Sequence, residues 1–235
     1  GGRTTAGSRA ASSHTGSLAG VEAIWEAVYR QTGVIPADDM DEMADLLVVF
    51  THMSPATGSN VAIIGAGGGA SVLATDICER AGLIVPELPE NARQKLREFV
   101  PEIGASTANP VDAPPLMILN PERVYETMMI VASAPEVDVL LLHMEPHIGA
   151  FRQKIEVLEM QADGIIRAAN KCGKPVAMVI TPAPVPQRAE VSYQLTKKYL
   201  GAGLATFPST ARAANAIAKF TRYHRNSEDR QTTQR

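Results

Sequence analysis

Short apolar runs alternate with longer amphipathic stretches along most of this chain. The runs are aliphatic or β-branched throughout, and they fall at residues 61–64, 83–85, 137–144, 175–181 and 204–207. Strands that are apolar on both faces belong to a sheet that is covered on both faces. Helical periodicity lies between and after them, near residues 70–81, 90–99, 121–134, 152–171, 188–200 and 210–223. The pattern predicts an α/β fold with a doubly wound, five-stranded parallel sheet, most like the flavodoxin arrangement.

The chain before residue 58 follows a different pattern. Val21 to Gly33 has one apolar helical stripe and a glycine stop, and Asp38 and Asp39 are natural caps for a second amphipathic helix. We expect the second helix to turn four side chains inward: Met40, Met43, Leu47 and Phe50. Residues 1–20 are small and polar, and we expect them to be flexible. Two helices and a short extended piece cannot close a core alone, so this part must lean on something else.

Local composition marks the boundaries between these regions. The stretch SPATGSN at 54–60 is typical of a linker, and the last eleven residues, RNSEDRQTTQR, contain no apolar side chain. We therefore divide the chain into a partial domain at 1–58, a flavodoxin-like domain at 59–225 and a disordered tail at 226–235.

Overall composition narrows the class of protein. With 45% hydrophobic and 20% charged residues the chain is an ordinary globular protein, and a formal net charge of -3 gives no reason to expect nucleic acid. Two cysteines without His or Cys neighbours suit a reducing compartment and predict no metal site. The apolar runs are too short to span a bilayer and no signal peptide is evident, so we expect a cytoplasmic protein with no membrane contact. The first residue looks like an arbitrary cut, and we expect a piece of something longer.

A glycine-rich turn follows the first predicted strand, in VAIIGAGGGASVLATD. The carboxyl edge of a parallel sheet is where ligands bind, and glycines at a helix start let backbone N–H groups approach an anion. A purely structural turn is the alternative. The spacing Gly65-x-Gly67-x-x-Ala70 also fits a relaxed dinucleotide fingerprint, with Glu87 where a ribose-binding acid would lie. The strand count argues against a complete dinucleotide domain, which leaves anion binding as the favoured interpretation.

Two further groups of polar residues are expected near the same edge. In TANPVDAP, Asn109 and Asp112 fit a turn better than a ligand contact, because Asn before Pro stabilises turn geometry. His143 and His147 flank MEP at the end of the central strand, where a satisfied edge histidine is favoured over a metal pair. The chain has neither a G-x-S-x-G elbow nor a G-x-x-x-x-G-K-[ST] phosphate loop.

The stretch SSHTGSLAG places His14 among small residues. A histidine on a loop is usually solvated surface. A neutral imidazole is nevertheless a competent nucleophile toward an activated phosphoryl group, and the resulting phosphohistidine would need donors such as those of the glycine turn. A phosphoryl carrier must also move between sites, which suits a segment of small residues.

The residues around His14 resemble a known family. The matching positions are Gly2-Arg3, Gly7, Arg9-Ala10-Ala11, Ser13-His14-Thr15-Gly16 and Leu18-Ala19-Gly20. They are similar to the phosphohistidine segment of the NDP-forming acyl-CoA synthetases, which resemble succinyl-CoA synthetase with its domains rearranged. QTGVIPADDMDEMADLL resembles the end of that family's second domain, and the chain from Asn60 onward resembles its third, flavodoxin-like ligase domain.

The resemblance implies that a carboxylate, CoA and a nucleoside triphosphate give acyl-CoA, nucleoside diphosphate and phosphate, through an acyl phosphate and a phosphohistidine. His14 would carry the phosphoryl group, and Asn109 and Asp112 would lie near the acid substrate. The residues expected to cradle the phosphoryl group are Gly67, Gly68, Gly69 and Ser71. The turn departs from the commoner family form, which has Asn at Ala66, Pro at Ala70 and Gly at Ser71, and this affects what can be said of the substrate.

The resemblance also implies partners. A CoA-binding Rossmann domain and an ATP-grasp domain or subunit would supply CoA, ATP or ADP, and Mg, and the chain alone should bind no cofactor tightly. A small carboxylic acid is the expected substrate, and a homo- or hetero-oligomer is compatible with the sequence. Two alternatives stay open: a non-catalytic regulatory or scaffold ligase-like domain, and an NAD-dependent oxidoreductase that uses the Gly65–Ala70 fingerprint.

Overall fold

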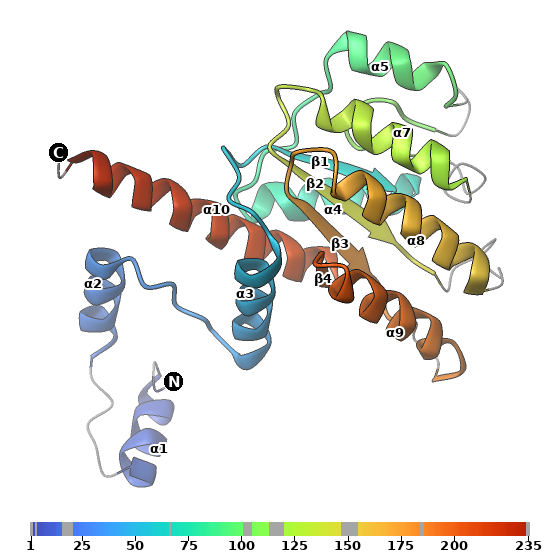
Figure 1. The fold of residues 1–235 in the computed structure, drawn as a ribbon. Coiled ribbons are helices and arrows are strands. Elements are labelled where there is room, and N and C mark those ends of the chain that lie inside the picture. Colours follow the sequence, from blue (N-terminus) through green and yellow to red (C-terminus); the bar gives the residue numbers. More distant parts are fainter. Residues whose placement is uncertain are drawn as a thin grey trace.

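A computed structural model describes residues 2, 4–15, 21–65, 67–100, 105–112, 120–146, 155–183 and 186–233. Its centre is a parallel sheet in which the strands follow one another in chain order (Figure 1). The strands are β1 (Val61–Gly65), β2 (Val139–Met144), β3 (Val176–Ile180) and β4 (Ala205–Phe207). In the register, Gly65 of β1 pairs with His143 of β2, which in turn pairs with Val179 of β3. Each crossover contains at least one helix, as parallel pairing requires.

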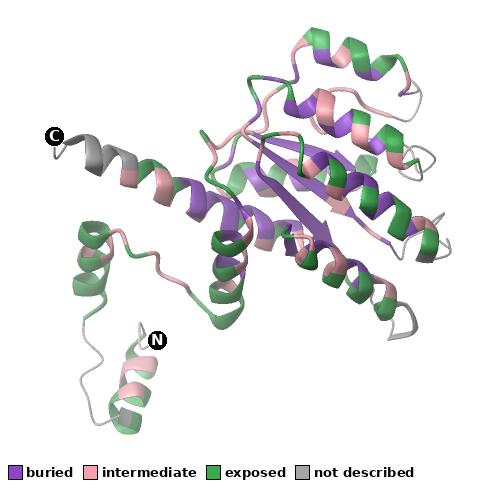
Figure 2. Ribbon diagram, in the orientation of Figure 1, coloured by how far each residue is buried: buried purple, intermediate pink, exposed green. Residues whose placement is uncertain are grey.

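Helices cover both faces of this sheet, as the apolar strand runs predict. The helices after β1 are α4 (Gly68–Arg80), α5 (Glu90–Arg97), α7 (Pro121–Ala132), α8 (Ile155–Ala169), α9 (Pro186–Gly201) and α10 (Thr210–Thr233). Leu140 and Leu142 belong to the core under α5, α7, α8 and α9, whereas Val139 and Leu141 belong to the core under α4 and α10. Successive strand residues therefore point into opposite cores, and Figure 2 shows the strands almost entirely buried. The doubly wound α/β prediction is confirmed.

The predicted strand at 83–85 is the exception, because the described sheet has four strands rather than five. This segment makes a single parallel bridge, between Ile84 and Asn60. The next N–H, of Val85, donates to the Glu79 carboxylate, and Pro86 has no N–H with which to continue a ladder. The segment thus turns away after one pair.

Three helices precede the sheet: α1 (Thr5–Thr15), α2 (Glu22–Thr32) and α3 (Met40–His52). The predicted signals at α2 and α3 are confirmed. Gly33 ends α2 in the left-handed region at φ 75°, and Asp39 caps α3 by accepting from the Glu42 N–H at 2.7 Å. The expectation that residues 1–20 lack regular structure is wrong for 5–15. That segment has one glycine and no proline, and its alanines favour a helix.

The prediction for the inward face of α3 is also wrong. Met40, Met43, Leu47 and Phe50 are 73%, 41%, 63% and 41% exposed. The buried positions are instead Asp45, Leu46 and Val49, which face the sheet domain because α3 packs on α10 and β4. Asp45 receives two hydrogen bonds from the Arg212 guanidinium of α10, at 2.7 and 2.9 Å. This ion pair and the neighbouring apolar contacts fix which side of the helix is covered.

The C-terminal region differs from its prediction as well. We expected a disordered tail at 226–235, but α10 continues to Thr233. A segment without apolar residues gains little from packing, yet nothing in residues 210–233 stops a helix once it has formed, since glycine and proline do not occur there. Within the described part of the chain, no helix combines the length and apolar character needed to cross a membrane.

Candidate functional site

The glycine turn joins the carboxyl end of β1 to the start of α4. Gly65 and Gly67 have φ of +93° and +73°, values that side-chain-bearing residues rarely adopt. A Cβ at Gly65 would also lie 2.6 Å from the His143 carbonyl oxygen, so the close approach of β1 to β2 requires glycine. Gly67 begins α4 without a side-chain cap, and Gly67, Gly68 and Gly69 are exposed. The turn thus presents an uncapped helix start to solvent, as the anion-binding hypothesis requires.

Ser71 lies on the inner side of this turn. Its side chain is buried, and its hydroxyl donates to the Gly65 carbonyl at 3.1 Å. The hydroxyl therefore closes the turn and keeps the helix start in place. Its predicted contact with a phosphoryl group stays a prediction, and so does the cradle formed by the three glycines.

Asn109 belongs to the edge of β1. Three alternate N–H groups on this edge have three different acceptors: Val61 donates to the Ile84 carbonyl at 2.7 Å, Ile63 to the Asn109 side-chain oxygen at 2.9 Å, and Gly65 to the Val111 carbonyl at 3.0 Å. The Asn109 amide also donates to the carbonyls of Val61 and Pro86. This side chain takes the place of a strand residue. The arrangement agrees with the structural interpretation of Asn109, and its assignment to the acid substrate remains a prediction.

Asp112 lies beside the start of α4. A Cβ placed on Gly68 would be 3.7 Å from the Asp112 carboxylate oxygen, and the backbone of Asp112 pairs with that of Ser106. Burial raises the pKa of the Asp112 carboxyl. The structure therefore brings Asp112 and the glycine turn together, as the sequence predicts, and it places an acidic group where an incoming anion would bind.

His14 is not part of this assembly. It lies in the last turn of α1 with its side chain exposed, and Figure 1 shows α1 apart from the sheet, on the far side of α2 and α3. Residues 16–20, which connect α1 to α2, lie outside the described residues. His14 and the glycine turn are thus separate in this arrangement.

The carboxyl edge contains one polar cluster that the sequence analysis undervalued. His143 is the last residue but one of β2, and Thr181 follows β3. The imidazole Nε2 lies 3.1 Å from the Thr181 hydroxyl and 3.7 Å from the Glu145 carboxylate. Nδ1 is buried and has no hydrogen-bond partner in the described chain. We expected a histidine with both nitrogens satisfied, and among the described residues only Nε2 has a partner. The sequence contains one signal for this cluster: the apolar runs at 137–144 and 175–181 both have a polar residue at or next to their last position, at the same edge of the sheet. His147 lies outside the described residues.

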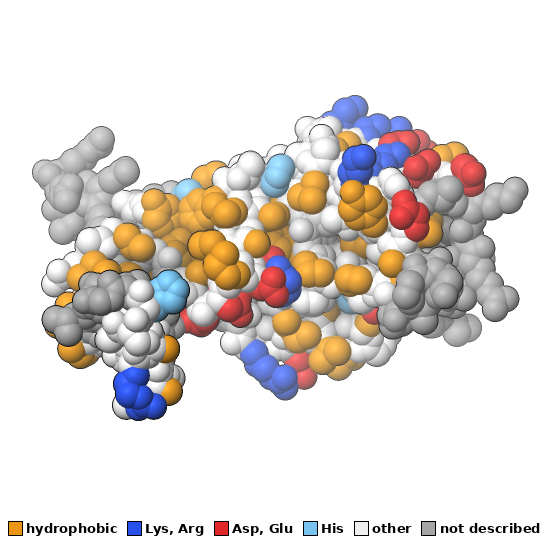
Figure 3. Space-filling model, turned by 90° about the horizontal axis from the view of Figure 1, so that it is seen from below, with side chains coloured by type: hydrophobic (Ala, Val, Ile, Leu, Met, Phe, Trp, Pro, Cys, Tyr) orange, Lys and Arg blue, Asp and Glu red, His pale blue; other side chains and the backbone are white. Residues whose placement is uncertain are grey.

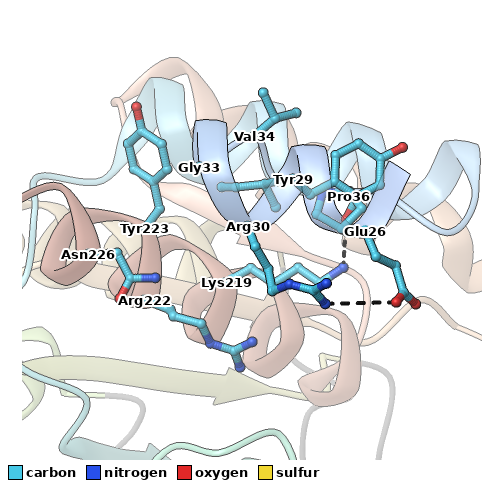
Figure 4. A pocket seen from close by; sticks show the side chains of 11 residues that line it. Glu26, Tyr29, Arg30, Gly33, Val34, Pro36, Lys219, Arg222, Tyr223 and Asn226 are labelled. Atoms are coloured by element: carbon cyan, nitrogen blue, oxygen red, sulfur yellow. Dashed lines mark hydrogen bonds and ion pairs between the residues drawn. The ribbon is translucent and has the colours of Figure 1, made fainter. Parts of the chain in front are cut away.

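A groove of about 560 Å³ lies elsewhere, between α2 and α10 (Figure 4). Its walls include Tyr29, Lys219 and Tyr223. Two of the cationic side chains that line it already have partners within the chain. Arg30 is 3.8 Å from Glu26, and Lys219 pairs with Glu42 and donates to the Pro36 carbonyl. The groove contains none of the predicted site residues.

Comparison with known proteins agrees with the fold, and two family models match successive parts of the chain. Residues 1–50 match the model of the succinyl-CoA ligase like flavodoxin domain, and residues 61–217 match the Ligase-CoA domain. The acetate–CoA ligase [ADP-forming] II subunit alpha of Pyrococcus furiosus is 37% identical over 191 residues, covering 80% of this chain and 40% of that subunit. The corresponding I subunit alpha is 31% identical over 228 residues, covering 94% and 45%.

A solved structure has the same fold. It is the dinucleotide forming acetyl-coenzyme A synthetase 1 of Ca. Korarchaeum cryptofilum in complex with phosphate and ADP, which superposes with a TM-score of 0.80 at 28% identity and covers 97% of this chain and 46% of that one. The chain spans less than half the length of these relatives. Fold, turn and matches together define a CoA-ligase domain of the α/β class. The chain belongs to the NDP-forming, succinyl-CoA synthetase-like acyl-CoA synthetase family.

Proposed function

We propose that this chain is the phosphohistidine and ligase portion of an enzyme that converts a carboxylate, CoA and ATP into acyl-CoA, ADP and phosphate. The observation that carries the proposal is the uncapped glycine start of α4 at the carboxyl edge, in a chain that also contains an exposed histidine on the family's phosphohistidine motif. Membership of the synthetase family supports the same reaction and weakens the dinucleotide alternative, and the intact histidine motif argues against a scaffold.

The proposed sequence of steps uses His14 twice. Its imidazole nitrogen accepts the terminal phosphoryl group of ATP, and the phosphohistidine then passes that group to a carboxylate oxygen of the acid. The CoA thiol loses its proton and attacks the acyl carbon, and the carbon–oxygen bond to phosphate breaks. The glycine turn would hold the phosphoryl oxygens by backbone N–H groups while the bonds change.

This scheme needs His14 to reach the carboxyl edge. Supporting features are the exposure of His14 at the end of a helix and the sequence Gly-Ser-Leu-Ala-Gly at 16–20, which follows Thr15. Small residues and two glycines allow large backbone changes at low steric cost. We therefore propose that His14 moves, together with α1, between a nucleotide site and the glycine turn.

We propose that the remaining substrates bind to other parts of the complete enzyme, outside this chain. The described residues offer no group of three His, Cys, Asp or Glu side chains placed to hold a metal, so we assign Mg to the nucleotide-binding part. A Rossmann domain for CoA and an ATP-grasp domain or subunit are the proposed partners. The exposed apolar residues of α2 and α3 provide surface on which such parts could pack.

The direct test is phosphorylation of the complete enzyme, assembled with its CoA- and nucleotide-binding parts. With labelled ATP we expect an acid-labile, base-stable phosphoenzyme, and His14→Ala should abolish both this label and acyl-CoA synthesis. His52→Ala, at the end of α3, is the matched histidine control and should keep both. Retention of the same label in a folded His14→Ala enzyme would contradict the assignment.

A further inference from the structure

The unpaired nitrogen of His143 is unusual for the position it occupies. The side chain is only 8% exposed, and Nδ1 lacks a hydrogen-bond partner among the residues that the structure describes. Buried polar atoms in native proteins nearly always have a partner, so an exception calls for an explanation. Nε2, by contrast, is held between the Thr181 hydroxyl at 3.1 Å and the Glu145 carboxylate at 3.7 Å. One side of the ring is thus anchored, and the other has no partner among the described residues.

The imidazole lies beside the glycine turn. In the parallel register the neighbour of His143 on β1 is Gly65, so β1 contributes no side chain next to the ring. His143 has the same parity along β2 as Val139 and Leu141, which face the core under α4 and α10. The ring is therefore on the α4 side of the sheet, at the edge where α4 begins.

The protonation state limits what the partner can be. Burial lowers the pKa of the His143 imidazole, while the Glu145 carboxylate acts in the opposite direction. The ring is thus neutral at neutral pH, with one nitrogen as donor and the other as acceptor. A hydroxyl group can pair with Nδ1 in either tautomer because it both donates and accepts, whereas an alkyl group can pair in neither.

We propose that Nδ1 of His143 binds a hydroxyl group of the acid, so that the enzyme prefers hydroxy-substituted carboxylic acids to plain alkanoic acids. The proposal rests on the proposed function, since it takes the acid to lie at the carboxyl edge beside the phosphoryl-binding turn. Thr181 and Glu145 act as positioning residues for the ring. Because Nδ1 is covered in the ligand-free chain, side chains at this edge must shift when the acid enters.

The kinetic test compares acids that differ only in a hydroxyl group. In the complete enzyme we expect kcat/KM for 3- or 4-hydroxybutyrate to exceed that for butyrate by about 100-fold, because a site built to bond a hydroxyl rejects an analogue that lacks it. His143→Leu should reduce this ratio to about 3-fold or less, and Thr181→Val should reduce it in part. His52→Leu is the matched control and should leave the ratio unchanged. Equal kcat/KM values in the wild type, or an unchanged ratio in a folded His143→Leu enzyme, would overturn the proposal.

A second measurement works without catalysis and covers the case in which His143→Leu does not fold. Imidazole ¹⁵N resonances of the wild-type chain are recorded during titration with 4-hydroxybutyrate and with butyrate. We expect the Nδ1 resonance of His143 to shift with the first acid only, and His143→Gln to remove the response. An enzyme that forms no phosphohistidine would contradict the proposed function but could still show this shift. A phosphorylated enzyme with neither shift nor preference would overturn the hydroxyl site alone.

Discussion

The sheet domain and the helices before it both contain regularly spaced apolar residues, but those residues are buried in the sheet domain and largely exposed in helix α2. Every residue of β1 and β3 is buried, and helices pack on both faces of the sheet. In α2 no residue is buried, and its apolar stripe of Val21, Ile24, Trp25 and Val28 is at least 36% exposed. Figure 3 shows hydrophobic side chains gathered over the part of the surface that these helices form. An apolar stripe indicates that a helix has a partner, but it does not say whether the partner is in the same chain.

The two regions are joined at a small number of side chains on α3 and α10. Phe50 contacts Phe220 and Tyr223 edge to face, with ring centroids 4.9 and 5.3 Å apart. Arg212 binds Asp45 and Lys219 binds Glu42. One side of α3 is therefore packed against the sheet domain and stabilised by it. The other side of α3 is exposed, as α2 is. Substitutions on the two sides should separate these roles.

The largest effect is expected at the turn on which the sheet domain depends. Gly65→Ala places a Cβ 2.6 Å from the His143 carbonyl oxygen and forces alanine to φ +93°. We expect a loss of about 3 kcal/mol in the free energy of unfolding, measured by guanidinium denaturation, from backbone strain and overpacking together. Gly69→Ala is the matched control, since no atom lies within 4 Å of its added Cβ. If the two variants were equally stable, the close β1–β2 contact would not be needed.

The next comparison uses two adjacent leucines. Leu46 is 9% exposed in the shared core and Leu47 is 63% exposed. Leu46→Ala should cost about 3 kcal/mol in the free energy of unfolding, because it leaves a cavity, whereas Leu47→Ala should change it by less than about 0.5 kcal/mol. Equal losses in the chain by itself would mean that the outer side of α3 is packed after all. In the complete enzyme the stability loss caused by Leu47→Ala should rise above its value in the chain alone, and it should rise more than the loss caused by Leu46→Ala.

These outcomes bear on what the sequence could predict. Four of the five predicted strand positions, both helix layers and the caps at Gly33 and Asp39 follow from local patterns, since each depends on the residues themselves or on their near neighbours. The covered face of α3 does not, because leucines 46 and 47 are both apolar and only contact with α10 distinguishes them. Contacts between segments far apart in the sequence determine which face of α3 is buried, and the periodicity of apolar residues does not predict such contacts.

The candidate site divides in the same way. The glycine turn and its neighbour Asp112 could be predicted, because a parallel sheet brings its carboxyl ends together. The side chain of Asn109 filling a strand position, and the half-satisfied ring of His143, could not, since both depend on the exact spacing between segments far apart in the chain. The position of His14 relative to the turn is likewise a matter of domain arrangement rather than local pattern.

A smaller effect is expected at the ion pair between α3 and α10. Arg212→Ala leaves the carboxylate of Asp45, which is 8% exposed, without its cation. Breaking a buried pair costs several kcal/mol, but the Arg212 side chain is 33% exposed, so solvent reduces the loss to about 2 kcal/mol. Arg30→Ala removes an arginine from a fully exposed pair on α2 and should change stability by less than about 0.5 kcal/mol. Thermal unfolding of both variants measures the difference, and a harmless Arg212→Ala would show that the other contacts hold α3 without this pair.

The smallest effect is expected at the carboxyl edge of the sheet domain. Burial raises the pKa of Asp112, so the folded chain holds the proton more tightly than the unfolded chain does. Stability should therefore fall as the pH rises from the ordinary aspartate range through the raised pKa. Asp112→Asn removes this titration, and we expect a small stability gain at pH 7 that disappears near about pH 3, where the wild-type carboxyl is protonated in both states. Asp76→Asn, on the exposed side of α4, should show no such pH-dependent gain. Equal pH profiles for the wild type and Asp112→Asn would instead mean that this edge is as well solvated as the surface of α2.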